Sequence, residues 1–313
     1  MTPKLKILQS GIMSLIQDEG RFGQHSVGLT TGGPLDPLAF KWANRLVGNA
    51  ENVAAIEVTV GGLKLRCMCN TYIAVTGAKV DVKINGHFHE QWQTLQLKKD
   101  DELELGYATQ GCRIYVAVAS GLNVPQQFNS NSTVIREGIG GLNGKALQQG
   151  DELPLFNETK VLPQYQLPEK DRPEYSDSVT LRLIPGYQEQ HFSRHEQRMF
   201  FYHEYSVSDL CDRMGNRLSG PKVQCDIGGI LSEGICLGAV QIPQDGQPIV
   251  LMNDRQTIGG YPKIGSVLSL DLAYLAQLGP GGKVKFEPIT IDHAHNELAL
   301  AQYKYGAQEL VKI

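Results

Sequence analysis

The stretch TYIAVTGAKVDVKINGHFHEQWQTLQLKKDDELELGYATQGCRIYVAVASG, residues 71–121, alternates apolar and polar side chains and is interrupted at Gly77, at Asn85-Gly86 and near Asp100. Alternation with a period of two is typical of half-buried β-strands. The Asn-Gly pair is a strong hairpin signal, because a type I′ turn needs positive φ at both central residues. We therefore expect an antiparallel meander that closes or packs on itself.

Short strand-like runs separated by turn residues continue along the rest of the chain. Its 313 residues include 34 glycines and 15 prolines, which supply the turns that many short strands require. Helices are expected over about 37–47, where Asp36 can cap the first turn, over 271–278, and from about His293 onward. The sequence therefore predicts a mainly β protein with a few short helices.

The length of the chain favours two packed β-rich units over one. A Pro-rich, charged segment, FNETKVLPQYQLPEKDRPEYSD, differs in composition from the sequence on either side of it. We expect an N-terminal domain over residues 1–160 that contains the helix at 37–47. A linker or crossover over 161–178 then leads to a C-terminal domain over 179–313 that ends in a helix.

Composition excludes several classes of protein. The 29 basic and 33 acidic residues give a net charge of −4, and no basic block marks a nucleic-acid surface. No apolar run approaches the roughly 18 residues of a membrane span, and the N-terminus lacks the apolar core of a secretory signal, so we expect a cytoplasmic protein. The six cysteines lie mostly in apolar contexts, which favours buried free thiols over a disulfide or zinc framework.

Common catalytic signatures are missing. In GGLNGKAL, residues 140–147, Ala146 stands where a phosphate-binding P-loop needs a hydroxyl. His87 and His89 alternate on an expected strand, so their rings point apart, and we expect no metal site. The sequence also lacks a Gly-x-Ser-x-Gly elbow, which leaves covalent hydrolysis without support.

A first polar constellation, QDEGRFGQHSVGLTTGGPLDP, covers residues 17–37. It leads to the start of the expected helix, where backbone N–H groups favour anions. The candidate binding residues are Gln17, Asp18 and Arg21. The alternative is an ordered loop whose glycines adopt positive φ.

The richest polar region covers residues 212–265 and ends in NDRQTIGGYPKIG. Guanidinium groups suit planar carboxylates and phosphates, and polar residues at strand ends are costly unless they meet a partner or a ligand. A network of satisfied turns remains the alternative. The candidate residues are Arg213, Arg217, Ser232, Glu233, Asp254, Thr257 and Tyr261.

Several long motifs occur here in a fixed order: GGPLDP with ANRLVGN, GIGGLNGKAL with GDELPL, RMGNRLSG, SEGICLGAVQIPQDGQPIVL and NDRQTIGGYPKIG. Together they resemble the carboxyltransferase-domain family, which includes allophanate hydrolase subunit 2, KipA and the C subunit of bacterial ATP-dependent 5-oxoprolinase. The resemblance runs from about Gln17 to about Phe286. It implies two cyclophilin-like β-barrel or sandwich domains.

The resemblance also implies partners and a reaction. A KipI-like protein, the B subunit, and a third subunit are expected to join this chain, with a homodimer inside a heterotetramer as one arrangement. Such a complex opens the lactam of 5-oxoproline to glutamate, with ATP and Mg²⁺ shared among the subunits. Biotin is not expected to be attached covalently, because the chain contains no Met-Lys-Met site.

Within that reaction the candidate residues receive expected roles. Glu233, Asp254 and Arg217 are the expected catalytic residues, and Arg213 joins Arg217 in holding an anion. Substrate contacts are expected from Gln17, Asp18, Arg21, Arg213, Ser232, Thr257 and Tyr261.

One departure from the family pattern concerns NSNST, residues 129–133, where members commonly read GSRST. Asn131 in place of arginine removes a bidentate anion contact. Two alternatives to the lactam-opening enzyme stay open: a KipA-type antagonist of a histidine-kinase inhibitor, and the acceptor half of a biotin-dependent carboxyltransferase acting on urea or another amide.

Overall fold

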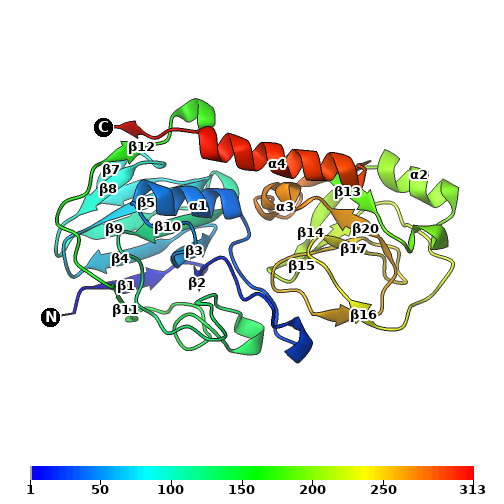
Figure 1. Ribbon diagram of the computed structural model, residues 1–313, viewed down its shortest axis with the longest axis horizontal. Coiled ribbons are helices and arrows are strands. Elements are labelled where there is room, and N and C mark those ends of the chain that lie inside the picture. Colours follow the sequence, from blue (N-terminus) through cyan, green and yellow to red (C-terminus); the bar gives the residue numbers. More distant parts are fainter. Residues whose placement is uncertain (1) are drawn as a thin grey trace. The chain divides into compact units, whose positions relative to one another are not determined.

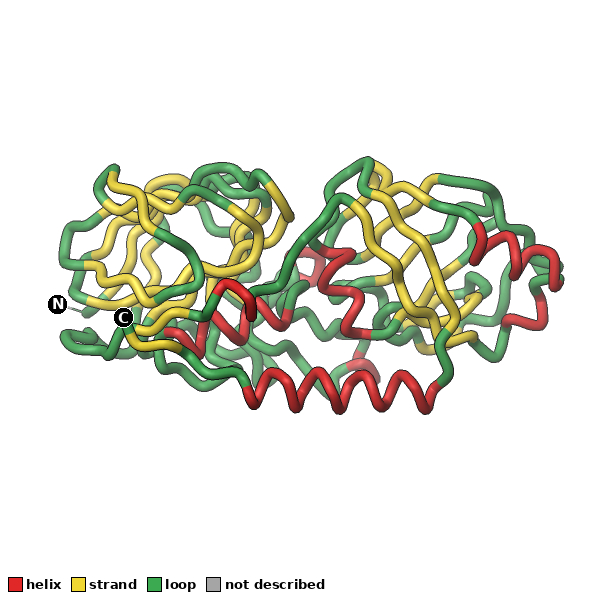
Figure 2. The backbone as a smooth tube through the Cα atoms, turned by 90° about the horizontal axis from the view of Figure 1, so that it is seen from above, coloured by secondary structure: helices red, strands yellow, loops and turns green. Residues whose placement is uncertain are grey.

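The computed structural model describes residues 2–313 and divides the chain into two compact units. Unit 1 comprises the chain up to Gly23, Thr31–Tyr175 and Glu309–Ile313, and unit 2 comprises Gln24–Thr30 and Ser176–Gln308. Figure 1 shows the elements of each unit, and Figure 2 shows that strands predominate over helices. The prediction of a mainly β protein with two β-rich units is confirmed.

Unit 1 is a sandwich of two sheets. The six-stranded sheet has the order β11-β1-β4-β9-β6-β7 and the five-stranded sheet the order β2-β3-β10-β5-β8. The bounds are β1 Lys4–Ser10, β2 Met13–Gln17, β3 Ala55–Thr59, β4 Leu63–Cys67, β5 Thr71–Lys79, β6 Val82–Ile84, β7 His87–His89, β8 Thr94–Leu97, β9 Glu102–Leu105, β10 Gln110–Val118 and β11 Glu152–Pro154.

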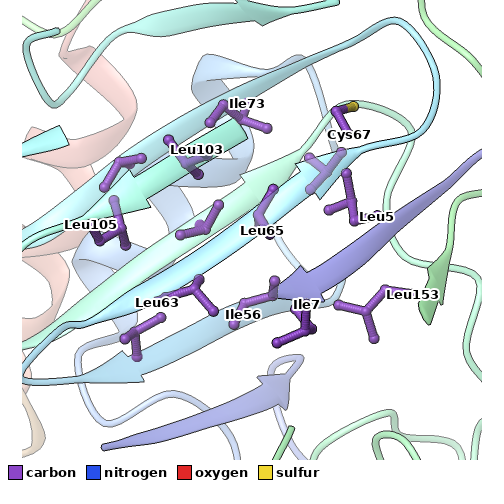
Figure 3. Packing of buried hydrophobic residues seen from close by; sticks show 14 of the residues in the cluster. Leu5, Ile7, Ile56, Leu63, Leu65, Cys67, Ile73, Leu103, Leu105 and Leu153 are labelled. Carbon is purple, nitrogen blue, oxygen red and sulfur yellow. The ribbon is translucent and has the colours of Figure 1, made fainter. Parts of the chain in front are cut away.

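The alternating apolar side chains of both sheets form one core. Ile7 of β1 and Leu65 of β4 come from the six-stranded sheet, whereas Ile56 of β3 and Ile73 of β5 come from the five-stranded sheet (Figure 3). All four are fully buried. The hydrophobic effect on this shared face therefore holds the two sheets together.

The opening stretch of the sequence forms strands β5 to β10, but it is not a simple meander. Strands β5, β8 and β10 belong to one sheet, and β6, β7 and β9 belong to the other. Asn85 and Gly86 do form the predicted turn between β6 and β7, with φ values of 52° and 82°. The local turn was therefore predictable, whereas the assignment of each strand to a sheet depends on burial across the whole core.

Gly77 marks the point where β5 bends against β10. Its φ is 89°, and a Cβ there would lie 2.2 Å from the carbonyl oxygen of Arg113. Gly77→Ala should lower the free energy of unfolding by about 2 to 4 kcal/mol, because it combines an unfavourable backbone conformation with an overpacked contact. Urea titration measures this loss.

The matched control is Gly86→Ala, because Gly86 also has positive φ but a Cβ there would meet no atom within 4 Å. Its cost should be only about 1 kcal/mol. Equal losses in the two variants would contradict the close-approach argument.

Residues 161–175, which the sequence predicts as part of a linker, group with unit 1. Strand β12, Tyr165–Gln166, pairs antiparallel with β22, Val311–Lys312. The last residues of the chain therefore complete unit 1. Composition could not show this pairing, because both strands are only two residues long.

Unit 2 is built on a closed barrel with the strand order β13-β20-β17-β18-β15-β14-β21. A separate two-stranded ribbon pairs β16 with β19. The bounds are β13 Ser178–Pro185, β14 Tyr205–Cys211, β15 Gly215–Ser219, β16 Glu233–Gly234, β17 Ala239–Gln241, β18 Ile249–Leu251, β19 Ile258–Gly259, β20 Lys263–Val267 and β21 Lys283–Pro288.

Three of the α-helices in residues 2–313 begin after a side chain that caps the first turn. Helix α1, Pro37–Leu46, starts after Asp36, whose carboxylate accepts from the N–H of Ala39, as predicted. The other helices are α2 Arg194–Tyr202, α3 Ser269–Ala276 and α4 Ile291–Ala307. Within residues 2–313, none of the helices is long and apolar enough to cross a membrane.

A charge network fixes two helices of unit 2 to the barrel. Arg182 of β13 donates to Asp271 of α3 at 2.6 Å and to Glu297 of α4 at 2.8 Å. The backbone N–H of Arg182 also donates to Asp271 at 2.7 Å. Guanidinium groups suit such multiple contacts because their donors form a rigid planar fork.

Candidate active site in unit 2

Two polar motifs that are well separated in sequence meet in the β16–β19 ribbon. Glu233 pairs with Gly259, and Gly234 pairs with Ile258. Beyond these pairs, the N–H of Ile235 donates to the carbonyl of Thr257 at 3.0 Å. The segments SEG and TIGG therefore form one structural feature, which we call the ribbon, residues 230–235 and 257–260.

The ribbon packs closely on one face of the barrel wall. Ile235 lies in a small apolar cluster with Ala239 of β17 and Leu251 of β18. A Cβ on Gly259 would lie 2.5 Å from Cδ1 of Ile235. Glycine therefore lets the ribbon backbone lie close to this side chain, and a larger residue would require the side chain of Ile235 to shift.

Glu233 projects from the ribbon into a cluster of hydrogen-bonding groups. Its carboxylate accepts from Nζ of Lys263 on β20 and, at 2.8 Å, from Nε2 of Gln188. The Oε1 of Gln188 in turn accepts from the backbone N–H of Lys263 at 2.8 Å. Lys263 is only 8% exposed and Gln188 only 6%, so the carboxylate is held from the protein side in a fixed orientation.

This cluster sets the charge of Glu233. The Lys263 ammonium, followed by the Tyr187 hydroxyl, lowers the pKa of Glu233 below its ordinary value of 4.5. Opposite charge and hydrogen bonding both favour the ionised form. Glu233 is therefore a carboxylate at neutral pH.

The lowered pKa predicts a pH dependence of stability. Because the folded pKa lies below the ordinary 4.5, the stabilisation is complete above that value and is lost as pH falls through the folded pKa. Wild type should exceed Glu233→Gln in free energy of unfolding at about pH 6, and the difference should disappear as pH falls through the folded pKa of Glu233. Urea titrations at several pH values measure the difference, and a gap that persists at acid pH would contradict the assignment.

Arg213 and Asp254 are brought together, as a buried ion pair with each other. Nε and Nη2 of Arg213 each lie 2.9 Å from an oxygen of the Asp254 carboxylate. The N–H of Asp254 also donates to the carbonyl of Arg213 at 2.8 Å. This bidentate pair ties the turn after β18 to the loop before β15.

The remaining candidates in unit 2 have more exposed positions. Arg217 of β15 forms an ion pair with Asp245. Ser232 is exposed within the ribbon, Tyr261 is exposed directly after it, and Thr257 is half-buried in the ribbon beside Ile235. Ser232, Thr257 and Tyr261 therefore lie in or next to the ribbon that carries Glu233.

The three candidates of the first constellation lie in unit 1. Asp18 accepts from the hydroxyls of Ser130 and Ser132 at 2.6 Å each, and from the N–H of Asn131 at 2.6 Å. Arg21 donates to two backbone carbonyls at 3.0 Å, and Gln17 bridges the carbonyl of residue 133 and the N–H of residue 33. In this structure all three side chains hold the NSNST loop in place.

The same loop accommodates its unusual asparagines. The side chain of Asn131 is buried and donates to the carbonyl of Val124 at 2.9 Å. Asn129 has a φ of 60°, a conformation that asparagine tolerates better than most residues. The departure from GSRST is therefore compatible with a well-bonded loop.

Sequence reasoning did not single out Lys263 or Gln188, and it noted Gln241 and Arg255 as polar residues of this region without giving them a role. Lys263 and Arg255 lie within the motif NDRQTIGGYPKIG, but nothing in the motif shows that their side chains are buried. Arg255 is 7% exposed and donates to the carbonyls of Ile235 and Met252, and burial lowers its pKa. The sequence signal for Gln241 was its place as a polar residue inside the apolar run GAVQIP, which indicates a buried polar side chain.

The expected carboxylates do not fit a magnesium–nucleotide site. Mg²⁺ bound with nucleotides is usually held by one or two carboxylates and by the phosphates. Here Glu233 is paired with Lys263, and Asp254 is paired with Arg213. Across residues 2–313, no group of three or more His, Cys, Asp or Glu side chains is placed to hold a metal ion.

These features define a two-part, mainly β protein in which a glycine-containing ribbon carries a carboxylate that is paired with a buried lysine of the barrel. The sequence model of the family described as "Carboxyltransferase domain, subdomain A and B" matches residues 27–288. The chain belongs to this family, and the resemblance found in the sequence is confirmed.

Two bacterial relatives match over nearly their whole length. The chain is 35% identical to the 5-oxoprolinase C subunit of Escherichia coli over 291 residues, which is 93% of each chain. It is 36% identical to the 5-oxoprolinase C subunit of Haemophilus influenzae over 312 residues, covering 96% of this chain and 97% of that one.

A solved structure extends the similarity to a larger protein. The crystal structure of urea amidolyase from Kluyveromyces lactis matches 97% of this chain with a TM-score of 0.91 and 28% identity. The match covers only 20% of the yeast chain. This chain is therefore similar to one portion of a much longer polypeptide.

Proposed function

We propose that this chain is the C subunit of a cytoplasmic, ATP-dependent 5-oxoprolinase-like complex that opens the lactam of 5-oxoproline to glutamate. Its proposed partners are a KipI-like B subunit and a third subunit. The observation that carries the proposal is the identity of 35% and 36% to two proteins named as the C subunit of 5-oxoprolinase, over at least 93% of each chain.

The cluster around Glu233 suits the activation of an amide. Lys263 can donate to the carbonyl oxygen, where negative charge develops as an amide reacts. When the Lys263 ammonium turns toward that oxygen, its hold on Glu233 weakens and the carboxylate becomes more basic. Glu233 can then accept the proton of the amide N–H. It can return this proton to the nitrogen when water has added to the carbonyl carbon and the C–N bond breaks.

ATP with Mg²⁺ remains part of the proposal, with the nucleotide held largely by the partner subunits. The pairing of Glu233 with Lys263 and of Asp254 with Arg213 supports this division of roles.

The test is co-purification of this chain with the proposed partners, followed by an assay of glutamate release from 5-oxoproline with and without ATP. Release that requires ATP and all three proteins is the expected result. No release from the complete assembly would overturn the proposal. Intact partner binding without release would instead favour the KipA-type regulatory role.

A second candidate function is carboxyl transfer to an amide nitrogen. The family match and the TM-score of 0.91 to a urea amidolyase favour it. Removal of an amide N–H proton would serve this reaction as well, because it makes the nitrogen nucleophilic. Transfer of labelled carboxylate from carboxybiotin to urea, in place of glutamate release, would identify this function.

A further inference from the structure

Gln241 is a buried polar side chain without a hydrogen-bond partner for its amide nitrogen. It ends strand β17, it is 1% exposed, and its Nε2 meets no acceptor among the residues that the structure describes. A buried donor left in this state costs about 1 to 3 kcal/mol. Such a group is explained if a ligand supplies the missing acceptor.

Gln241 faces the ribbon. Ala239 and Gln241 are two apart on one strand and so share a face, and Ala239 contacts Ile235 of the ribbon. A Cβ on Gly259 would lie 3.0 Å from Nε2 of Gln241. The amide therefore points at the ribbon backbone at Gly259, which has no side chain to place between them.

Lys263 supplies a second donor beside the ribbon. It pairs with Gln241 in the β17–β20 ladder, next to a shift in register between Val240 and Gln241. Nε2 of Gln241 lies near Gly259, and Nζ of Lys263 donates to Glu233, the residue that pairs with Gly259. An ammonium has three N–H donors, and the single side-chain acceptor that the described residues give to Lys263 is Glu233. Two donors of the barrel thus lie near the carboxylate that the ribbon carries.

We propose that Gln241, Lys263 and Glu233 form a recognition site for an amide whose N–H lies cis to its C=O. Gln241 and Lys263 donate to the carbonyl oxygen, and Glu233 accepts from the N–H beside it. A lactam ring holds its N–H and C=O cis, and a primary amide such as urea always has one N–H in that position. An open-chain secondary amide is trans and presents the two groups on opposite edges.

This site rests on the proposed function, because it specifies how that reaction selects its substrate. The ribbon covers Gln241 in this structure, so the ligand enters when the ribbon opens. Glu233, which the ribbon carries, meets the ligand when the ribbon closes again. Its two strands are two residues long each, and a segment held by few backbone hydrogen bonds opens at low cost.

Gln241→Met tests the site because methionine keeps the length of the side chain and removes the donor. In the complex with its partner subunits, the variant should bind 5-oxoproline about tenfold more weakly, as expected for the loss of one hydrogen bond. The ligand-free variant should melt at the same temperature or higher, because the unsatisfied buried group is gone. Calorimetric titration and thermal unfolding measure the two effects.

The matched control is Gln302→Met on the exposed face of α4, which should change neither quantity. A second measurement uses wild-type complex and a ligand without the N–H, N-methyl-5-oxoproline, which should bind at least about tenfold more weakly than 5-oxoproline. This measurement does not depend on the folding of any variant.

The measurements test the proposed function and the amide site separately. Wild-type complex that neither binds nor hydrolyses 5-oxoproline would overturn the proposed function. Wild-type binding that is unchanged by Gln241→Met, or equal binding of the N-methylated ligand, would overturn the amide site alone. Weaker binding with a lower melting temperature would assign Gln241 a structural role and would also overturn it.

Discussion

Glutamate release by the assembled complex should fall by about 100- to 10,000-fold when Glu233 is replaced by glutamine, the usual range for loss of a general acid or base. Glutamine keeps the shape of the side chain and can still accept from Lys263, but it cannot take up the amide proton. The rate with saturating 5-oxoproline and ATP measures the effect.

Glu287→Gln is the control for this experiment, because Glu287 lies exposed on β21 of the same unit. Its rate should match wild type. Stability at neutral pH should decline only modestly in Glu233→Gln, because the side chain keeps its volume and part of its hydrogen bonding. If the variant is folded and its rate lies within about tenfold of wild type, Glu233 does not act as the general base.

Asp254→Ala should lower the free energy of unfolding by about 3 to 5 kcal/mol, because it leaves the Arg213 guanidinium in a buried place without this carboxylate. Arg213 is 5% exposed and Asp254 8%, and their pairing is bidentate. Urea titration followed by circular dichroism measures the loss.

The double variant Arg213→Met with Asp254→Ala should be more stable than Asp254→Ala alone. Arg213→Met removes the buried guanidinium that Asp254→Ala leaves without its carboxylate. The coupling energy from the complete double-mutant cycle should lie within about 0.5 to 3 kcal/mol, the usual range for residues in contact. Additive losses would contradict a direct pair. A loss of less than about 1 kcal/mol for Asp254→Ala would place the pair among exposed ion pairs.

Local features of the fold could be predicted because nearby residues decide them. The turn at Asn85-Gly86 and the cap at Asp36 each depend on a few neighbouring dihedrals and hydrogen bonds. The predicted helix from about His293 begins at Ile291, since the hydroxyl of Thr290 accepts from the N–H of His293 and caps the first turn.

The candidate site could be predicted only in part, because its contacts join distant segments. The sequence marked Glu233 as a polar residue in an apolar run, but its partners Lys263 and Gln188 become visible only once β16 lies against β19. Arg213 and Asp254 were both identified from the sequence as charged candidate residues. Spacing alone could not show that each would serve as the partner of the other.

The order of strands in unit 2 bears on how the protein folds during synthesis. Strand β13 pairs in parallel with β21, which joins Ser178 to Lys283, whereas the outer strand β11 of the sandwich, which pairs with β1, ends at Pro154. Because chains emerge from the ribosome from the N-terminus and contacts between distant residues form slowly, the sandwich can close while the barrel is still incomplete. The first strand of the barrel must then wait, with both edges unpaired, until β20 and β21 have been made.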